Sequence, residues 1–180
     1  MVLSFVLPGM LRSNPSAATP TGEAPGAGLQ VGMTVPAFAG TDLLSGQAVT
    51  ASSVYDQKTL LFFSEGISCQ ACLEQIQGIQ QIGSQMAKRD IHLVSITPDP
   101  RAALRQAVTA YDITTPIISD TSLAMSRAFN TLGKGMHSDT PGHAFALIYH
   151  GKVLWYHDYW ITNGTMYVPP ASLLAAMPSV

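Results

Sequence analysis

The sequence of 180 residues predicts an α/β fold built around a mixed sheet with helices on its faces. Apolar runs that suit buried strands alternate with longer stretches of helical periodicity, the pattern of a sheet with parallel strands. Near the carboxyl end, strands predicted at 144–149 and 153–158 are separated only by a turn at His150-Gly151-Lys152. So short a connection makes these two strands antiparallel, and the sheet as a whole is therefore expected to be mixed.

The predicted elements begin at about residue 30 with a short hairpin region between Val35 and Gln47. The further elements are a strand at 59–64, a helix at 70–88, a strand at 91–97, a helix at 100–110, a short strand at 116–119, a helix at 121–131, the two strands above, and a last helix near 170–177. Pro100 suits the first turn of its helix, which Asp99 is expected to cap. No internal repeat is visible.

Length and composition place further bounds on the protein. A chain of 180 residues corresponds to about one domain. It is 47% hydrophobic and only 11% charged, against roughly 25% charged residues in an average soluble domain, so it can bury a sizeable core. The net charge is -2 and the nine Lys and Arg residues form no basic stripe. The sequence therefore predicts no nucleic-acid partner.

The first 28 residues are predicted to lie outside a domain that spans residues 29–180. Residues 1–12 are apolar and end in Arg12, but they are too few to span a bilayer, which takes about 20 residues. They also lack the basic start of a standard signal peptide. Residues 13–28 are rich in Ser, Pro, Ala, Thr and Gly, as in a flexible linker. We expect an extracytoplasmic protein that is secreted or tethered to a membrane through its N-terminus, with a cytoplasmic protein as the alternative.

The two cysteines of the chain, Cys69 and Cys72, stand where the strand at 59–64 gives way to the helix at 70–88. A CxxC motif at such a junction is typical of a redox dithiol. The N-terminus of a helix favours the thiolate of the first cysteine, and the second sulfur lies about one turn on, within reach of a short disulfide. Two cysteines alone cannot complete a zinc site. The motif therefore predicts thiol–disulfide chemistry without a cofactor or metal, and a structural pair or a metal-binding pair remains the alternative.

Several segments, in their order along the chain, resemble the thioredoxin fold in the redoxin branch that holds TlpA/ResA-like thiol–disulfide oxidoreductases and AhpC/TSA peroxiredoxins. The similar segments are 35–38 (the "aPdF" opening), 93–99 (the second strand), 118–121 with 128–129, and 143–153 (the "TFLID..GkI" strand). The resemblance covers residues 31–178. It implies a thioredoxin-like fold with the hairpin as an N-terminal extension. It also implies a thiol–disulfide oxidoreductase whose Cys69 and Cys72 exchange disulfides with a thiol or a protein partner, Cys69 being the exposed nucleophile.

Three other residues are candidate auxiliary groups at this site. Pro141 lies close to the position of the family's cis-proline, which would hold a backbone edge against the disulfide. His143 would begin the strand that faces the CxxC motif, where it could relay a proton or tune the thiolate; a loop histidine bonded to the backbone is the alternative. Glu65, four residues before the first cysteine, could raise a thiol pKa or act as the base for the second cysteine.

The resemblance leaves two other activities open. Peroxiredoxins carry PxxxTxxC and a nearby Arg around the reactive cysteine, but Phe62 and Gly66 stand at the Pro and Thr positions here, and the nearest basic candidate is His143. We therefore expect poor peroxide reduction. Sco-like copper-binding redoxins share the fold, and two thiolates with His143 could hold Cu(I), although the Sco motif is CxxxC.

Ser68 stands where thioredoxins carry a Trp before the first cysteine. The aromatic residues near Trp160 belong either to the core or to a partner groove that replaces that Trp.

Overall fold

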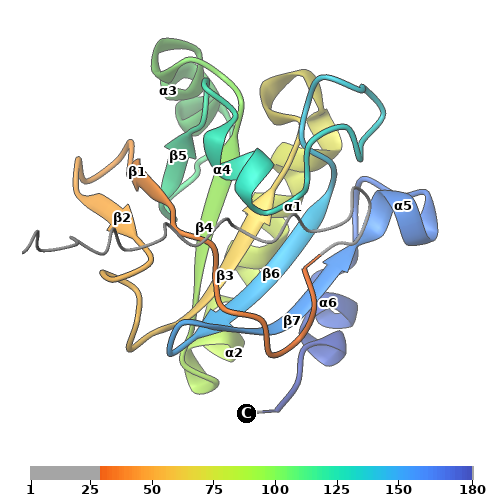
Figure 1. The fold of residues 1–180 in the computed structure, drawn as a ribbon. Helices are drawn as coiled ribbons and strands as arrows, with labels where there is room; N and C mark the ends of the chain where they lie inside the picture. Colours follow the sequence, from red (N-terminus) through yellow and green to blue (C-terminus); the bar gives the residue numbers. More distant parts are fainter. Residues whose placement is uncertain (1–28, 180) are drawn as a thin grey trace, which may run out of the picture.

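The computed structural model describes residues 29–179, which form a five-stranded mixed sheet flanked by helices (Figure 1). The strands are β3 (Lys58–Phe63), β4 (Ile91–Thr97), β5 (Ile117–Ser119), β6 (Ala144–Tyr149) and β7 (Lys152–Asp158). Their order across the sheet is β5-β4-β3-β6-β7. Strands β3, β4 and β5 run parallel to one another, whereas β6 is antiparallel to both β3 and β7. The predicted mixed sheet and its terminal antiparallel pair are confirmed.

The helices and the N-terminal hairpin complete the fold. The helices are α1 (Gln70–Gln81), α2 (Gly83–Lys88), α3 (Arg101–Ala110), α4 (Ala124–Ala128), α5 (Tyr159–Asn163), α6 (Pro170–Ala176) and the short 3-10 helix η1 (Gly66–Ser68). The hairpin pairs β1 (Ala39–Thr41) with β2 (Ala48–Thr50), a few residues later than the sequence predicted. Neither η1 nor α5 was predicted, because segments this short carry no clear periodicity.

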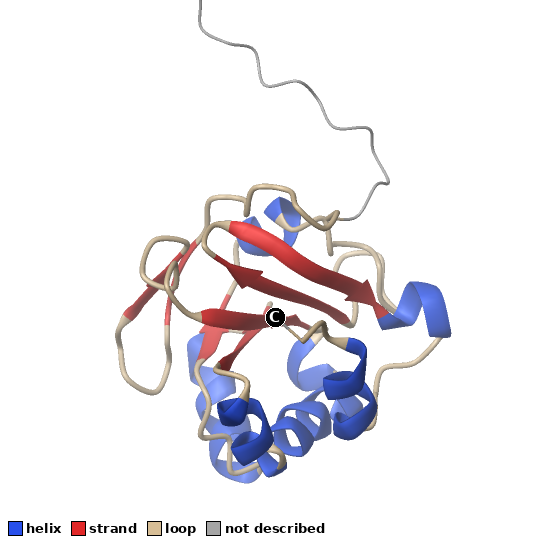
Figure 2. Ribbon diagram, turned by 90° about the horizontal axis from the view of Figure 1, so that it is seen from below, coloured by secondary structure: helices blue, strands red, loops and turns tan. Residues whose placement is uncertain are grey.

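The central strand β3 shows why the core has two layers. Its side chains alternate, so Leu60 and Phe62 enter one apolar cluster while Leu61 and Phe63 enter the other. The first cluster includes residues of α1, α2, α3 and α6, and Figure 2 shows helices grouped on one side of the sheet. The second cluster is covered by the N-terminal segment, the β1–β2 hairpin and α4. Burial on both faces accounts for the unbroken apolar run of β3.

The helix predicted at 70–88 is divided into α1 and α2. The break falls at Ile82, whose ψ of 17° departs from helical geometry, and Gly83, a poor helix former, begins the second piece. Ile76, Ile79 and Met86 nevertheless remain buried on the same face of the sheet, so the predicted apolar stripe is present. The correction therefore concerns the continuity of the helix and not its packing.

The helix predicted at 121–131 is reduced to α4. Asp120 is buried, and its carboxylate accepts the backbone N–H groups of Met125 at 3.2 Å and Ser126 at 2.8 Å. These bonds hold the chain in a turn before the helix, and Leu123 adopts a left-handed conformation there. A buried aspartate that caps the helix from several residues upstream thus delays its start.

The predictions for residues 1–28, including their export or tethering role, concern a part of the chain outside the described residues. Between residues 29 and 179, no helix is long and apolar enough to cross a bilayer.

Candidate active site

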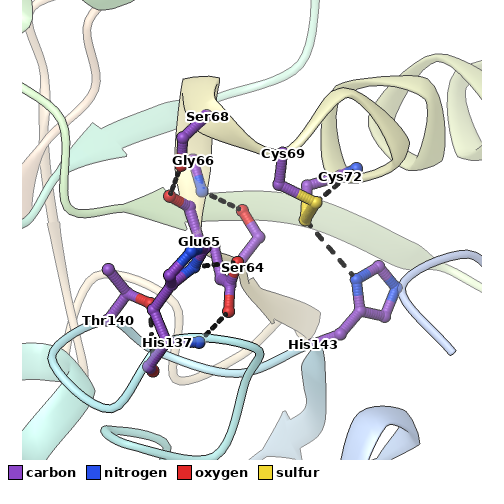
Figure 3. A network of polar contacts seen from close by, with 9 residues as sticks. All are labelled: Ser64, Glu65, Gly66, Ser68, Cys69, Cys72, His137, Thr140 and His143. Atoms are coloured by element: carbon purple, nitrogen blue, oxygen red, sulfur yellow. Dashed lines mark hydrogen bonds and ion pairs between the residues drawn. A yellow bond between two sulfur atoms is a disulfide. The ribbon is translucent and has the colours of Figure 1, made fainter. Parts of the chain in front are cut away.

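The cysteine pair lies where the sequence placed it, between the end of β3 and the first turn of α1 (Figure 3). Cys69 is the N-cap of α1, and its sulfur accepts the backbone N–H of Cys72 at 3.2 Å. The two residues are joined by a disulfide, with their Cα atoms 5.3 Å apart. The same N–H also donates to the carbonyl of Cys69 at 3.0 Å, and together with the partial positive charge at the start of α1 it would stabilise a thiolate on the Cys69 sulfur.

The expected exposure of Cys69 is not observed. Cys69 is 3% exposed and Cys72 is fully buried in this disulfide form. Both pack with Met166, and Ala71 and Trp160 lie at the margin of the same cluster. Trp160 belongs to α5 and Met166 to the segment that follows it, so residues after β7 return to cover the disulfide. The aromatic group near the end of the chain therefore includes one ring that packs against the reactive pair.

His143 lies beside the inner sulfur, as its position ahead of β6 led us to expect. Its Nδ1 is 3.8 Å from Sγ of Cys72, and the side chain is fully buried. The ring packs edge-on against Phe62 and Phe145, with centroids 4.7 Å and 5.4 Å away. Burial lowers the pKa of His143 to about 3, because an imidazolium in this apolar environment would lose its hydration. A neutral imidazole thus stands next to Cys72.

Gln75 is a site residue that sequence analysis missed. It lies one turn beyond Cys72 on α1, and its side chain is fully buried. Its Oε1 is 3.3 Å from Nε2 of His143, so the glutamine, the imidazole and the inner sulfur form a connected row. A glutamine on an amphipathic helix is ordinarily assigned to the solvent face, and nothing local in the sequence marks this one as buried.

Glu65 has a different role from the two that the sequence suggested. Its carboxylate is almost fully buried, and it accepts the backbone N–H of His137 at 3.0 Å. The second carboxylate oxygen lies 3.0 Å from Nδ1 of the same histidine. Figure 3 shows this pair apart from Cys72 and His143. Glu65 therefore anchors the loop between α4 and β6, and no contact joins it to either sulfur.

Gly66 is required by the backbone that leads into the motif. Its φ is +81°, a left-handed value that favours glycine, and a Cβ atom there would collide with the carboxylate of Asp99. That carboxylate accepts the backbone N–H of Ile67 at 2.9 Å instead of capping α3 as predicted, and burial raises the pKa of Asp99. A threonine at position 66, as in the peroxiredoxin pattern, would compete with Asp99 for the same space.

Pro141 does not form the expected cis-proline edge. The peptide bonds of residues 29–179 are all trans. Pro141 instead forms an isolated β-bridge with Leu132, and the next residue, Gly142, donates its N–H to the carbonyl of Thr131 at 2.9 Å. These bonds join the two ends of the loop between α4 and β6.

Peroxiredoxins place an arginine near the reactive cysteine, and the partners of the four arginines in residues 29–179 bear on that activity. Arg89 donates to the carbonyls of Leu174 and Met177 near α6, and Arg127 donates to the carbonyl of Ser122. The remaining two, at 101 and 105, are exposed on α3. Among residues 29–179, no three His, Cys, Asp or Glu side chains are grouped so that they could hold a metal ion.

Comparisons with known proteins agree with this architecture. The model of the AhpC/TSA family matches residues 31–155. The peroxidoxin BcpB of Mycobacterium tuberculosis is 19% identical with a TM-score of 0.68, and the match covers 82% of this chain and 95% of that chain. A putative thiol:disulfide interchange protein DsbE from Chlorobium tepidum is 20% identical with a TM-score of 0.60, over 72% of this chain and 86% of that one.

A peroxiredoxin-like protein from Aquifex aeolicus is 17% identical with a TM-score of 0.64, over 74% of this chain and 78% of its own. No curated protein matches the sequence. At these identities the solved structures show the fold alone, and they confirm that it is thioredoxin-like. The family model covers more than half of the chain, and the cysteine pair lies within the matched residues. The chain belongs to the AhpC/TSA family of thioredoxin-fold redoxins.

Proposed function

We propose that the protein is a thiol–disulfide oxidoreductase in which Cys69 and Cys72 alternate between a dithiol and a disulfide. The observation that carries the proposal is the arrangement around the pair. The two cysteines are bonded directly to each other at the start of α1, and a buried neutral histidine lies 3.8 Å from the inner sulfur. Such an arrangement suits a cycle in which the second cysteine resolves an adduct formed on the first.

The first step uses the helix N-terminus. In the reduced protein the Cys69 thiolate is stabilised by the N–H of Cys72 and by the partial positive charge of α1. The thiolate attacks one sulfur of a partner disulfide. A bond forms between Cys69 and that sulfur, the partner disulfide breaks, and its other sulfur leaves with the electron pair as a thiolate.

The second step uses the inner cysteine and the histidine. Cys72 attacks the Cys69 sulfur of the mixed disulfide, and its thiol proton passes through the neutral His143 beside it; because the pKa of this ring is about 3, the ring relays the proton and does not keep it. The bond between Cys69 and Cys72 forms, and the remaining partner sulfur leaves as a thiolate that takes up a proton. The partner is then reduced by two electrons and the protein is oxidised; the reverse sequence would oxidise a dithiol partner.

The burial of the disulfide adds a requirement to this cycle. With Cys69 only 3% exposed, an incoming sulfur reaches it only when Trp160 and Met166 shift from the pair. These two side chains lie on a short helix and the segment after it, outside the sheet that supports the cysteines. We call Trp160 and Met166 the cover of the disulfide. We expect this cover to move when the partner, a thiol or a disulfide-containing protein, engages the site.

Peroxide reduction is the second candidate, because the chain shares a family with AhpC/TSA proteins and its fold with a peroxidoxin. In that reaction the Cys69 thiolate would attack a peroxide oxygen. Two features weigh against it: Gly66 has no hydroxyl to orient the peroxide, and Arg89 and Arg127 donate to backbone carbonyls and not to the cysteine pair. The proposed exchange reaction needs neither group.

A redox titration tests the proposal. We expect the oxidised protein to be reduced in one two-electron transition, with a midpoint between about -120 and -270 mV, the range of characterised exchange enzymes. The protein would be equilibrated with glutathione and dithiothreitol couples, quenched with a maleimide and weighed by mass spectrometry, with the Cys69→Ser/Cys72→Ser double variant as the unlabelled control. A pair that stays oxidised below about -300 mV would be a structural disulfide, and the proposal would then fail.

A further inference from the structure

The side-chain amide of Gln75 can adopt only one orientation. Its Nε2 donates to the carbonyl of Val168 at 3.0 Å, and its Oε1 accepts the N–H of the same residue at 2.6 Å. A backbone carbonyl only accepts and a backbone N–H only donates, so exchanging the amide oxygen and nitrogen would break both bonds. Because the side chain is fully buried, no water would replace them.

This fixed orientation determines which nitrogen of His143 carries the proton. Oε1 of Gln75 faces Nε2 of His143 at 3.3 Å, and an amide oxygen can only accept. Nε2 must therefore hold the hydrogen. Because burial keeps the ring neutral, Nδ1 is left with a free lone pair, and this is the atom that lies 3.8 Å from Sγ of Cys72.

We propose that Gln75 is a positioning residue that holds His143 in its Nε2–H tautomer and thereby keeps Nδ1 free to accept the proton of Cys72. Phe62 and Phe145 pack against the ring, and within residues 29–179 the two ring nitrogens face Gln75 and Cys72. The amide of Gln75 is therefore the polar group that selects between the two tautomers. The opposite tautomer would direct an N–H at the sulfur and could accept no proton from it.

The inference rests on the proposed exchange reaction for its chemical purpose. During resolution the proton of Cys72 moves to Nδ1, the Cys69–Cys72 bond forms, the bond from Cys69 to the partner breaks, and the partner sulfur leaves with the electron pair. The tie to Val168 also links the tautomer to the segment that carries Met166 over the disulfide. Gln75 thus connects the base, the inner cysteine and the cover of the site.

The tautomer can be observed without any assay of activity. Long-range proton–nitrogen spectra of protein labelled with ¹⁵N-histidine distinguish a protonated from an unprotonated ring nitrogen. In the wild type we expect a protonated Nε2 and an unprotonated Nδ1, in both redox states. Gln75→Leu removes the acceptor and should shift the ring to the other tautomer or to a mixture. Gln75→Glu, as a neutral acid whose O–H faces the carbonyl of Val168, retains an oxygen acceptor toward Nε2 and should keep the proton there.

The kinetic consequence can be measured with Ellman's reagent, a small aromatic disulfide. Attack by Cys69 releases one coloured thiolate, and resolution by Cys72 releases a second. In Gln75→Leu the second phase should slow by about tenfold or more, as for loss of a general base, and by more than any change in the first phase. Gln80→Leu is the matched control: Gln80 also lies on α1 and clamps the backbone at Asp112 and Thr114, but it has no contact with His143.

An Nδ1–H tautomer in the wild type would overturn the inference, and so would an unchanged tautomer in Gln75→Leu. An equal slowing in Gln80→Leu would also overturn it, because the effect would then be a general loss of helix packing. Should Gln75→Leu fail to fold, the wild-type spectrum and Gln75→Glu still decide the question. A correct tautomer in a protein that exchanges no disulfides would instead refute the proposed function and leave the assignment of the proton intact.

Discussion

The Cys72→Ser variant should become trapped on its substrate, because the side chain that resolves the mixed disulfide is lost. Cys69 keeps its position at the N-terminus of α1, so the first attack should proceed at close to the wild-type rate. Release of the adduct should slow on the order of 10³-fold or more, as when a nucleophile is removed from an enzyme. The adduct with a cysteine-containing peptide disulfide would be followed by mass spectrometry under non-reducing conditions.

Cys69→Ser is the matched control for this experiment. Its remaining thiol, at Cys72, is fully buried and faces His143 rather than the partner side, so it should form little adduct. Limiting alkylation of the reduced wild type should likewise label Cys69 well before Cys72. Adducts that accumulate on Cys69→Ser instead of Cys72→Ser would reverse the assignment of nucleophile and resolving cysteine.

Acid should destabilise the fold through His143. The pKa of this histidine is about 3 in the folded protein and 6.5 in its ordinary state, so between these values the unfolded chain binds more protons. Its contribution to stability is therefore complete above pH 6.5 and is lost as the pH falls toward 3. At 1.36 kcal/mol per pKa unit, the full loss is on the order of 5 kcal/mol, of which about 3 kcal/mol falls between pH 6.5 and pH 4. Urea unfolding of the oxidised protein from pH 7.5 down to 4 would measure this upper part of the loss.

Two carboxyl groups, the half-buried Asp99 and the buried Asp158, act in the opposite sense and make a control necessary. Burial raises the pKa of Asp99 and Asp158, so the folded state holds their protons more tightly and gains stability as the pH falls through their folded pKa values. The informative comparison is between wild type and His143→Leu. The free energy of unfolding should change less steeply with pH in the variant than in the wild type. His92→Leu, at an exposed histidine, should leave the slope unchanged. Equal slopes in wild type and His143→Leu would refute the explanation.

The parts of the site that sequence analysis could predict are those set by short-range patterns. The apolar run of β3 and the helical stripe that follows it place Cys69 and Cys72 at a strand–helix junction, because both patterns depend on residues only a few positions apart. His143 was expected near the pair only because the similar family orders its strands so that β6 faces the motif. Local periodicity together with one family resemblance was therefore enough to predict the mixed sheet and the position of the cysteine pair.

The parts that could not be predicted depend on contacts between distant segments. The backbone of Val168 holds the amide of Gln75, 93 positions earlier in the chain, and no local pattern marks either residue. The cover formed by Trp160 depends on a five-residue helix whose direction is set by the Asp158 side chain, which accepts the N–H of Ile161. Glu65 illustrates the same limit: its spacing from the first cysteine suggested a base, but its partner comes from a loop 72 positions later.

The proposed exchange reaction is tested most directly by comparing how fast Cys69 reacts with a disulfide and with a peroxide. The reduced Cys72→Ser variant, which isolates the Cys69 thiolate, would be mixed in a stopped-flow instrument with hydrogen peroxide and, separately, with a peptide disulfide. Free cysteine at the same pH would serve as the reference for each reaction. We expect Cys69 to attack the disulfide much faster than free cysteine does, and to react with peroxide at about the free-cysteine rate. Oxidation by peroxide several orders of magnitude faster than that of free cysteine would contradict the account and establish the protein as a peroxidase.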